Sequence, residues 1–493
     1  MNYKSTRNSK NIVTPSQAIL QGLATDGGLY VPESFPSFDL NWEILSQYTY
    51  QEMAHFILKP FLSDFSDEQL KRCIELAYDN KFDTEVIAPV VDIDEKHYHL
   101  ELFHGSTIAF KDMALSILPH LMKTSAEINN NYNDILILTA TSGDTGKAAM
   151  AGFSDVPGTK IIVFYPKGGV SSIQEQQMLT QTGDNTHVVS IVGNFDDAQT
   201  EVKNLFNDSV LRDELQSSDS QFSSANSMNI GRLVPQIVYY FYAYAQLVKQ
   251  GKIDAGSEID FSVPTGNFGN ILAGYYAKRS GLPIGKLLCA SNDNKVLYDF
   301  FQDGEYNRQR DFILTISPSM DILVSSNLER LVYHAVNEDS ERLSDLMEQL
   351  DTKGHYTLTD EEQAHFSSFL SDYVTEAQTK EEINIVYRKT GYIMDTHTAV
   401  ASRAWRNLNQ EGFSTNPAVI VSTASPYKFP EAVLVALGVE AETLTDQELL
   451  DKLNELSNIP YPPAIEGLLE AERLHDTAIE VSDMREFVRN IAK

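Results

Sequence analysis

The chain has 493 residues, 42% of them hydrophobic, which is enough to build two or three domains around a large buried core. Its 38 basic and 69 acidic side chains give a formal charge of −31, and so negative a surface repels nucleic acid and anionic lipid. We therefore expect a small-molecule ligand, with no nucleic-acid partner and no membrane partner.

The cysteines and the first residues of the chain narrow the class of protein further. Cys73 and Cys289 have no Cys or His close by in the sequence, which argues against a disulfide framework and against a zinc site. The first ten residues are polar, and no later apolar run approaches the length of a membrane span. The sequence therefore predicts a cytoplasmic protein without a bound metal.

Helical patterns dominate both ends of the chain. We expect a mainly helical N-terminal domain over residues 1–95, in which Ser66 and Gln69 form a capping box ahead of apolar residues at helical spacing. A second helical segment is expected over residues 431–493.

Between these ends, short β-rich runs alternate with helical patterns, which predicts an α/β core over residues 96–430 with a mostly parallel, doubly covered sheet. The runs are residues 135–138, 161–164, 188–192, 259–263, 287–289 and 419–421. A helical insertion interrupts them at about 327–390, where capping boxes are expected to begin at Thr359 and Thr379. The serine-rich stretch 216–227 is expected to be a loop. Ligands of such folds bind at the carboxyl ends of the strands.

A lysine stands where a polar loop meets an apolar helix, in Phe103-His-Gly-Ser-Thr-Ile-Ala-Phe-Lys-Asp-Met113. The apolar neighbours of Lys111 desolvate its ammonium, and desolvation lowers the pKa of a lysine, which favours Schiff-base and proton-transfer chemistry. The alternative is a lysine at a helix edge that extends into water, which is the commoner case. Loops elsewhere in the chain decide between the two.

The loop Thr139-Ala-Thr-Ser-Gly-Asp-Thr-Gly-Lys147 follows a predicted strand and opens a helix. Its amides and hydroxyls at the helix N-terminus suit a carboxylate or a phosphate. It is not a nucleotide-binding P-loop, because Thr141 and Ala148 stand where that motif needs Gly and Ser or Thr. The alternative is that Ser142 and Thr145 only cap the helix.

Two further strands end in loops that suit a ligand. In Val263-Pro-Thr-Gly-Asn-Phe-Gly-Asn270, two glycines permit a tight turn and let backbone amides approach a ligand's oxygens, as in a phosphate cup. A plain connector is the alternative there. After the last strand, Thr423 offers a neutral hydroxyl to a heteroaromatic nitrogen, unless backbone groups satisfy it. A Schiff-base lysine, a phosphate cup and a neutral partner for a ring nitrogen are the three needs of pyridoxal 5'-phosphate (PLP).

Six motifs resemble those of the threonine synthase family, in its longer form with an N-terminal domain, over essentially the whole chain. They are Thr25-Asp-Gly-Gly-Leu-Tyr-Val-Pro32, Phe103-His-Gly-Ser-Thr-Ile-Ala-Phe-Lys-Asp112, Thr139-Ala-Thr-Ser-Gly-Asp-Thr-Gly146, Gly266-Asn-Phe-Gly-Asn270, Ser325-Ser-Asn-Leu-Glu-Arg330 and Asp395-Thr-His-Thr-Ala-Val400. The resemblance implies a two-lobed fold-type II PLP enzyme, similar to the β subunit of tryptophan synthase. It also implies a lyase that converts O-phospho-L-homoserine and water to L-threonine and phosphate, the last step of threonine biosynthesis.

The resemblance also assigns roles to residues. It implies that Lys111 holds the cofactor and moves substrate protons, and that Thr423 meets the pyridine nitrogen. The residues implied for the cofactor phosphate are Gly266, Asn267, Phe268, Gly269 and Asn270. For the substrate, the implied residues are Ser142, Gly143, Asp144 and Thr145 at the α-carboxylate, and Arg232 and Lys428 at the phosphate.

Some positions depart from the family pattern. Ser425 stands where the family often has histidine, Thr396 where it often has proline, and Ile230 near the place of an aromatic residue. His104 and His397 lie in matched motifs, and each has either a functional or a purely structural role.

Two other functions remain open. Another PLP-dependent lyase or dehydratase would share the lysine and the phosphate cup, but it would lack a second cationic site for a substrate phosphate. A non-catalytic, ligand-sensing relative would keep the fold alone. For any of these, we expect a monomer or a homodimer.

Overall fold

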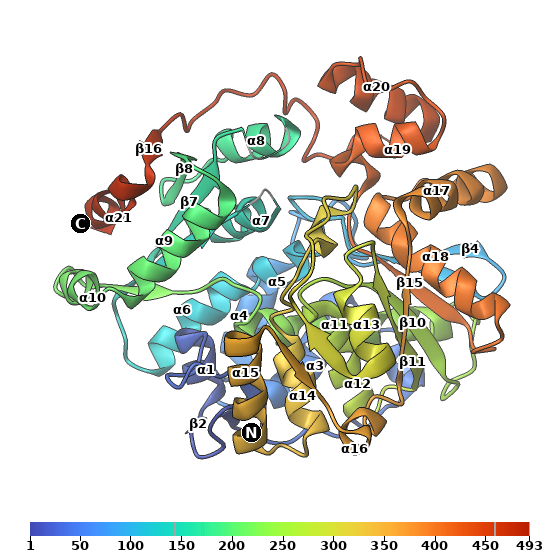
Figure 1. Ribbon diagram of the computed structural model, residues 1–493, viewed down its shortest axis with the longest axis horizontal. Helices are drawn as coiled ribbons and strands as arrows, with labels where there is room; N and C mark the ends of the chain where they lie inside the picture. Colours follow the sequence, from blue (N-terminus) through green and yellow to red (C-terminus); the bar gives the residue numbers. More distant parts are fainter. Residues whose placement is uncertain (142–143, 169, 171, 458–459, 493) are drawn as a thin grey trace.

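The computed structural model describes residues 1–141, 144–168, 170, 172–457 and 460–492. Two α/β lobes lie side by side, and the C-terminal segment runs from the larger lobe across to the smaller one (Figure 1). Each lobe is built on its own mainly parallel sheet. The expected two-lobed α/β architecture is therefore confirmed.

The large-lobe sheet has the strand order β14-β11-β10-β15-β5-β4, and each neighbouring pair is parallel except β4 with β5. Its strands are β4 (Val90–Asp94), β5 (His97–Glu101), β10 (Ile259–Pro264), β11 (Ile284–Ser291), β14 (Phe369–Tyr373) and β15 (Ala418–Ser422). Alternate side chains enter two different cores. Leu287 and Val419 join the cluster around α11 (Ile230–Lys249) and α12 (Gly269–Arg279), whereas Leu288 and Ile420 pack against α18 (Thr396–Gln410). Burial on both faces explains the continuous apolar runs of this sheet.

The small-lobe sheet is parallel throughout, in the order β16-β8-β7-β6-β9. Its strands are β6 (Asp134–Ala140), β7 (Thr159–Pro166), β8 (Thr186–Val192), β9 (Ser220–Ser223) and β16 (Ala478–Glu480). Leu136 and Ile162 pack with α9 (Phe195–Asn207), α10 (Ser209–Gln216) and α21 (Met484–Ala492), while Ile137 and Val163 belong to the central core with α7 (Asp144–Phe153). All six strands predicted from the sequence lie within β6, β7, β8, β10, β11 and β15, so these predictions are confirmed.

Most of the strands that the sequence did not reveal are edge strands, although β5, an interior strand of the large sheet, was missed as well. The stretch 216–227 was expected to be a loop, but it contains β9, which pairs with β6. The segment 327–390 supplies four helices and also β13 (His355–Thr357) and β14, the outermost strand of the large sheet. These strands are short and lack an apolar run, because an edge strand has only one neighbour to pack against.

The capping boxes at Ser66 and Thr359 are confirmed, but the one at Thr379 is wrong. The helix α17 (Glu376–Thr390) begins one turn earlier, where Thr375 is the N-cap and Gln378 closes the box. The side chain of Glu382 is buried and pairs with Arg406 instead of capping a helix. A Thr-x-x-Gln pattern followed at once by Thr-x-x-Glu offers two starts, and burial of the second selects the first.

The N-terminal region combines a three-stranded sheet with helices. Its elements are β1 (Tyr3–Ser5), β2 (Ile12–Val13), α1 (Pro15–Gln21), β3 (Tyr30–Pro32), α2 (Trp42–Leu45), α3 (Tyr50–Phe61) and α4 (Asp67–Ala77). Arg330, in α14 (Leu328–Ala335), is fully buried and donates to the carbonyl oxygens of Tyr30 at 2.8 Å and Met228 at 2.6 Å. Glu329 accepts from Thr6 Oγ1 at 2.6 Å. The motif at 325–330 thus fastens this region to the core.

The C-terminal segment ties the lobes together. Its helices α19 (Pro430–Ala436) and α20 (Asp446–Ser457) pack beside α17 on the large lobe, and β16 then joins the small-lobe sheet (Figure 1). The other elements are α5 (Asp112–Leu115), α6 (Leu118–Ile128), α8 (Ser172–Leu179), α13 (Val296–Asp303), β12 (Glu305–Asn307), α15 (Ser340–Lys353), α16 (Asp360–Ala364), and the 3-10 turns Pro318–Met320, Pro426–Lys428 and Val481–Asp483. Within the described ranges, no helix combines the length and apolar character that crossing a bilayer requires.

Candidate active site

Three adjacent parallel strands of the large lobe bring the predicted loops together. The strand β5 leads to the loop that ends at Lys111, β15 leads to Thr423, and β10 leads to the loop 265–270. Because β5, β15 and β10 are parallel neighbours, the three loops leave the same edge of the sheet.

Backbone pairing holds the Lys111 loop beside Thr423. The amide of Phe110 donates to the Thr423 carbonyl oxygen at 2.8 Å, and the amide of Ser425 donates to the Ile108 carbonyl oxygen at 3.0 Å. Ile108 has a φ of 51°, a left-handed conformation that costs a β-branched residue energy. Lys111 itself is half-buried. Two predicted cofactor residues therefore lie on directly bonded segments.

Asp112 stabilises the turn that carries Lys111. It is buried, and its carboxylate accepts from the Thr107 amide at 2.8 Å and from the Thr107 hydroxyl at 2.6 Å. Burial raises the pKa of Asp112, although the bonds from Thr107 oppose the rise. The buried Lys428 donates its Nζ to the Thr107 carbonyl oxygen at 2.9 Å. Lys428 thus holds the turn that carries Lys111, a contact that was not predicted from the sequence.

The loop 265–270 forms a cup at the N-terminus of α12. Phe268, its helix-capping residue, adopts a left-handed φ of 66°. Gly266 has no room for a side chain, because a Cβ there would lie 2.4 Å from the Ser319 carbonyl oxygen. The first amides of a helix have no intrahelical acceptor, so the start of α12 at Gly269 suits an anion.

Residues of the 325–330 motif hold the outer side of the cup. Ser325 Oγ donates to the Gly266 carbonyl oxygen at 2.7 Å. The amide and Nδ2 of Asn327 both donate to the Asn267 carbonyl oxygen, at 3.1 Å and 3.0 Å. The sequence matched this motif to a family without giving it a role, and its role here is to fix the cup.

Asn270 supplies a donor from which no described residue accepts. Its Oδ1 accepts from the hydroxyls of Tyr239 at 2.7 Å and Tyr240 at 2.8 Å, while its Nδ2 is buried and has no hydrogen-bond partner among the described residues. A buried donor left unpaired costs about 1–3 kcal/mol, and a ligand oxygen removes that cost. The cup therefore fits a phosphate group.

Arg232 is a buried cation that has no counter-charge among the described residues. Only 4% of it is exposed, its Nη1 donates to the Ala225 carbonyl oxygen at 2.9 Å, and its Nε has no partner among the described residues. Burial lowers the pKa of Arg232 to about 10. An uncompensated buried charge is costly, so this guanidinium indicates an anionic ligand.

The small lobe supplies the remaining predicted loop. Ser142 and Gly143 lie outside the described residues, and α7 begins directly after them with Asp144 and a half-buried Thr145. A Cβ on Gly152 would lie 2.1 Å from the Leu115 carbonyl oxygen. The backbones of α7 and α5 therefore touch, which brings the two lobes together beside the lysine turn.

Lys147, the second lysine of this region, was not among the predicted site residues. Its Nζ donates to Gln181 Oε1 at 2.6 Å. Burial and the nearby Lys428 lower the pKa of Lys147 to about 8, and Asp112 opposes that shift. Its position as the last residue of the predicted anion loop 139–147 was the only signal in the sequence. Lys147 and Lys428 together add positive potential between the lobes.

His104 is the centre of an ion-pair cluster. Its Nδ1 lies 2.6 Å from Asp83 Oδ1 and its Nε2 lies 2.9 Å from Glu101 Oε2. Burial alone would lower the pKa of His104, but the two carboxylates outweigh it and raise the pKa to about 9. The cluster joins the 103–111 loop to the segment that follows the N-terminal helices.

We expect His104→Gln to lower the free energy of unfolding by roughly 2 kcal/mol at about pH 6. The folded-state pKa lies above the ordinary value, so the stabilisation is complete below about pH 6.5 and is lost as the pH rises through about 9. Urea unfolding of both proteins across this range measures the difference. A difference that stays constant with pH would show that His104 is not held as a cation.

These loops define a class of enzyme. A half-buried lysine, a phosphate cup and a strand-end threonine converge at one sheet edge, and the family model described as pyridoxal-phosphate dependent enzyme matches residues 96–425. The geometry of the cup at residues 265–270 and the family-model match both indicate PLP as the cofactor. The chain is thus a PLP-type, two-lobed protein of fold type II.

Two further family models flank this match: threonine synthase N terminus over residues 2–78, and threonine synthase, C-terminal over residues 398–488. The chain belongs to the threonine synthase family. It is 38% identical over 437 residues to threonine synthase of Pseudomonas aeruginosa, covering 88% of this chain and 90% of that protein.

Other relatives agree. The crystal structure of PLP-bound threonine synthase from Brucella melitensis has a TM-score of 0.89 and 36% identity, with 100% of both chains covered. Human threonine synthase-like 1 is 40% identical over 470 residues, which cover 92% of this chain. The chain spans only 62% of the length of that human protein.

Proposed function

We propose that the protein acts as a threonine synthase, converting O-phospho-L-homoserine and water to L-threonine and phosphate in the last step of threonine biosynthesis. The buried, uncompensated guanidinium of Arg232 carries this proposal, because it provides an anion site in addition to the cup at residues 265–270. A lyase or dehydratase that acts on an unphosphorylated amino acid needs only one such site. A small-molecule substrate also suits the charge of −31.

PLP is the cofactor that the site would hold. Lys111 would bind its aldehyde carbon, the hydroxyl of Thr423 would meet its pyridine nitrogen, and residues 266–270 would bind its phosphate. The unused Nδ2 of Asn270 supports the last assignment. When bound, PLP withdraws electrons from the substrate, so that protons on Cα and Cβ become acidic.

Protons are moved by Lys111. In our proposal its Nζ takes the Cα proton and later returns it to the same carbon. Between these transfers Cβ loses a proton as phosphate leaves Cγ, Cγ gains a proton to become the methyl group, and water adds to Cβ. Asp112, Thr107 and Lys428 keep the lysine turn in place during these transfers. The neutral hydroxyl of Thr423 leaves the ring nitrogen unprotonated, which moderates electron withdrawal.

The substrate's two anionic groups go to different lobes. We assign the α-carboxylate to the loop Ser142, Gly143, Asp144 and Thr145, at the N-terminus of α7. The phosphate goes to Arg232 as a bidentate fork, and Lys428 adds a point charge. In domain terms, we propose 1–95 as the N-terminal domain, 96–430 as the catalytic core and 431–493 as the C-terminal helical segment.

Product analysis tests the proposal. Purified protein loaded with PLP and given phosphohomoserine should release threonine and phosphate in equal amounts. Phosphate with a 2-oxo acid in place of threonine would favour an eliminating lyase. No product and no cofactor absorbance band would favour the non-catalytic relative.

A further inference from the structure

His397 lies in the first turn of α18 and is buried. Its Nδ1 lies 2.7 Å from Asp395 Oδ2, and the same oxygen accepts from the His397 amide at 2.9 Å. Asp395 is the N-cap of α18, so its carboxylate is fixed by the helix start. A carboxylate at Nδ1 keeps the proton there, which leaves Nε2 as an acceptor.

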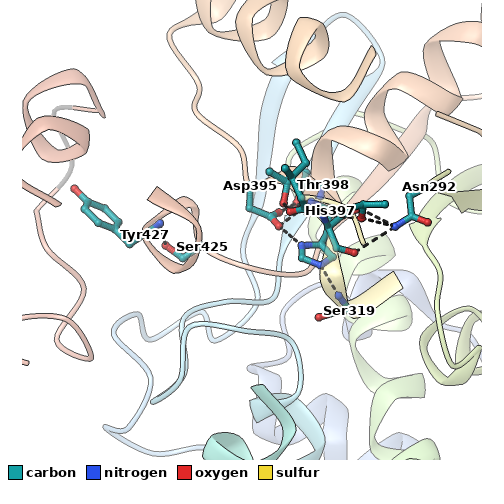
Figure 2. Close-up of polar contacts among 11 residues, drawn as sticks. Asn292, Ser319, Asp395, His397, Thr398, Ser425 and Tyr427 are labelled. Atoms are coloured by element: carbon teal, nitrogen blue, oxygen red, sulfur yellow. Dashed lines mark hydrogen bonds and ion pairs between the residues drawn. The ribbon is translucent and has the colours of Figure 1, made fainter. Parts of the chain in front are cut away.

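That acceptor holds a turn of the backbone. The amide of Ser319 donates to His397 Nε2 at 3.1 Å, and Figure 2 shows the imidazole between Asp395 on one side and Ser319 on the other. Ser319 belongs to the 3-10 turn Pro318–Met320. The histidine thus joins the start of α18 to a turn 78 residues away in the sequence.

The same turn closes on the cup. A Cβ on Gly266 would lie 2.4 Å from the Ser319 carbonyl oxygen and 3.3 Å from Met320 Cα. Gly266 is therefore in direct contact with the turn Pro318–Met320. Its carbonyl oxygen also accepts a hydrogen bond from Ser325 Oγ at 2.7 Å. The position of Ser319 sets how far Gly266 can move.

Other bonds hold the base of this loop. Thr396 Oγ1 donates to the Ile316 carbonyl oxygen at 2.6 Å, and Asn292 Nδ2 donates to Asp321 Oδ1 at 2.8 Å. These contacts lie before and after the turn. At the turn itself, His397 accepts a hydrogen bond from the amide of Ser319, and Ser319 is the residue whose carbonyl oxygen touches Gly266.

We propose that His397 is a positioning residue for cofactor binding: through Ser319 it fixes the backbone of Gly266 in the conformation that receives the phosphate of PLP. The inference rests on the proposed binding of that phosphate by residues 266–270. His397 then acts on cofactor binding. The alternative role is a purely structural one, in which His397 stabilises the start of α18.

Two substitutions separate these roles. His397→Gln places an acceptor near the position of Nε2, while His397→Asn keeps a donor near Asp395 and removes the acceptor for Ser319. We expect the Asn variant to bind PLP about tenfold more weakly and the Gln variant to stay within about threefold of the wild type. Affinity for pyridoxal, which has no phosphate, should be equal in all three proteins.

The measurements are absorbance titrations with PLP and with pyridoxal, together with urea unfolding of each cofactor-free protein. His334→Gln is the matched control, since His334 is also buried and bonds Glu338 at 3.1 Å and Tyr276 at 3.2 Å, neither of which belongs to the loop 265–270. Equal PLP affinities for the Asn variant and the wild type, or equal losses for Asn and Gln, would overturn the inference alone. Wild-type protein that binds no PLP would overturn the proposed function and the inference with it.

Discussion

Lys111→Ala is expected to lower kcat by at least about 10⁴-fold, because it removes both the anchor of the cofactor and the group that moves the Cα proton. The absorbance band of cofactor bound to the protein should disappear as well. Stability should change little, since Lys111 is only half-buried and lies at the start of a short helix. Kinetics with phosphohomoserine and a PLP absorbance spectrum provide the two readouts.

Lys123→Ala, on α6, is the control for this experiment, because it removes a lysine from a neighbouring helix without touching the three loops. Its band and turnover should match those of the wild type. A persistent band in Lys111→Ala, with turnover reduced by less than about tenfold, would mean that another lysine carries the cofactor. Lys147 and Lys428 would then be the residues to examine, since both lie beside the lysine turn.

Arg232→Met is expected to lower kcat/KM for phosphohomoserine by about 10³-fold, since truncating one partner of a buried charge pair costs about 2–5 kcal/mol. The cofactor band should remain. The substitution should leave the cofactor-free protein as stable as the wild type, or more stable by about 1 kcal/mol. The physical reason is that, within the described ranges, Arg232 is a buried charge with no counter-charge until an anion binds.

Arg330 offers a matched comparison. It is equally buried and its pKa is also lowered to about 10 by burial, but its guanidinium donates to Tyr30, Met228 and Asn327. Arg330→Met should therefore destabilise the protein by about 3 kcal/mol. Steady-state kinetics and urea unfolding of both variants test the contrast. Equal destabilisation by the two substitutions would show that Arg232 is a structural residue too.

The site loops, and the strands β10 and β15 that lead to two of them, were predictable because their signals are local, whereas β5 was missed. Buried parallel strands read as apolar runs, and the loop at 263–270 shows its glycines directly. Edge strands such as β9 and β14 were missed since their pairing depends on partners far along the chain. The start of α17 also depends on long-range contacts, because the burial of Glu382 determines which of two possible capping boxes forms.

Roles that depend on a missing or distant partner could not be read from the sequence. Only the folded chain shows that, in the part that the structure describes, Arg232 has no counter-charge whereas Arg330 has three acceptors. His104 and His397 lie in equally good motifs, yet one pairs with Asp83 and Glu101 and the other bonds the turn against the cup. Lys147 ends the predicted anion loop, and Lys428, one of the charges that shifts its pKa, lies far away in the sequence.

The most direct test of the central claim is the fate of the solvent oxygen during turnover. With phosphohomoserine in water enriched in oxygen-18, the account predicts label in the threonine hydroxyl and none in the released phosphate. The hydroxyl comes from water at Cβ, whereas the bridging oxygen leaves Cγ with the phosphate. Labelled phosphate accompanied by homoserine would mean that water attacks phosphorus, and that result would contradict the account.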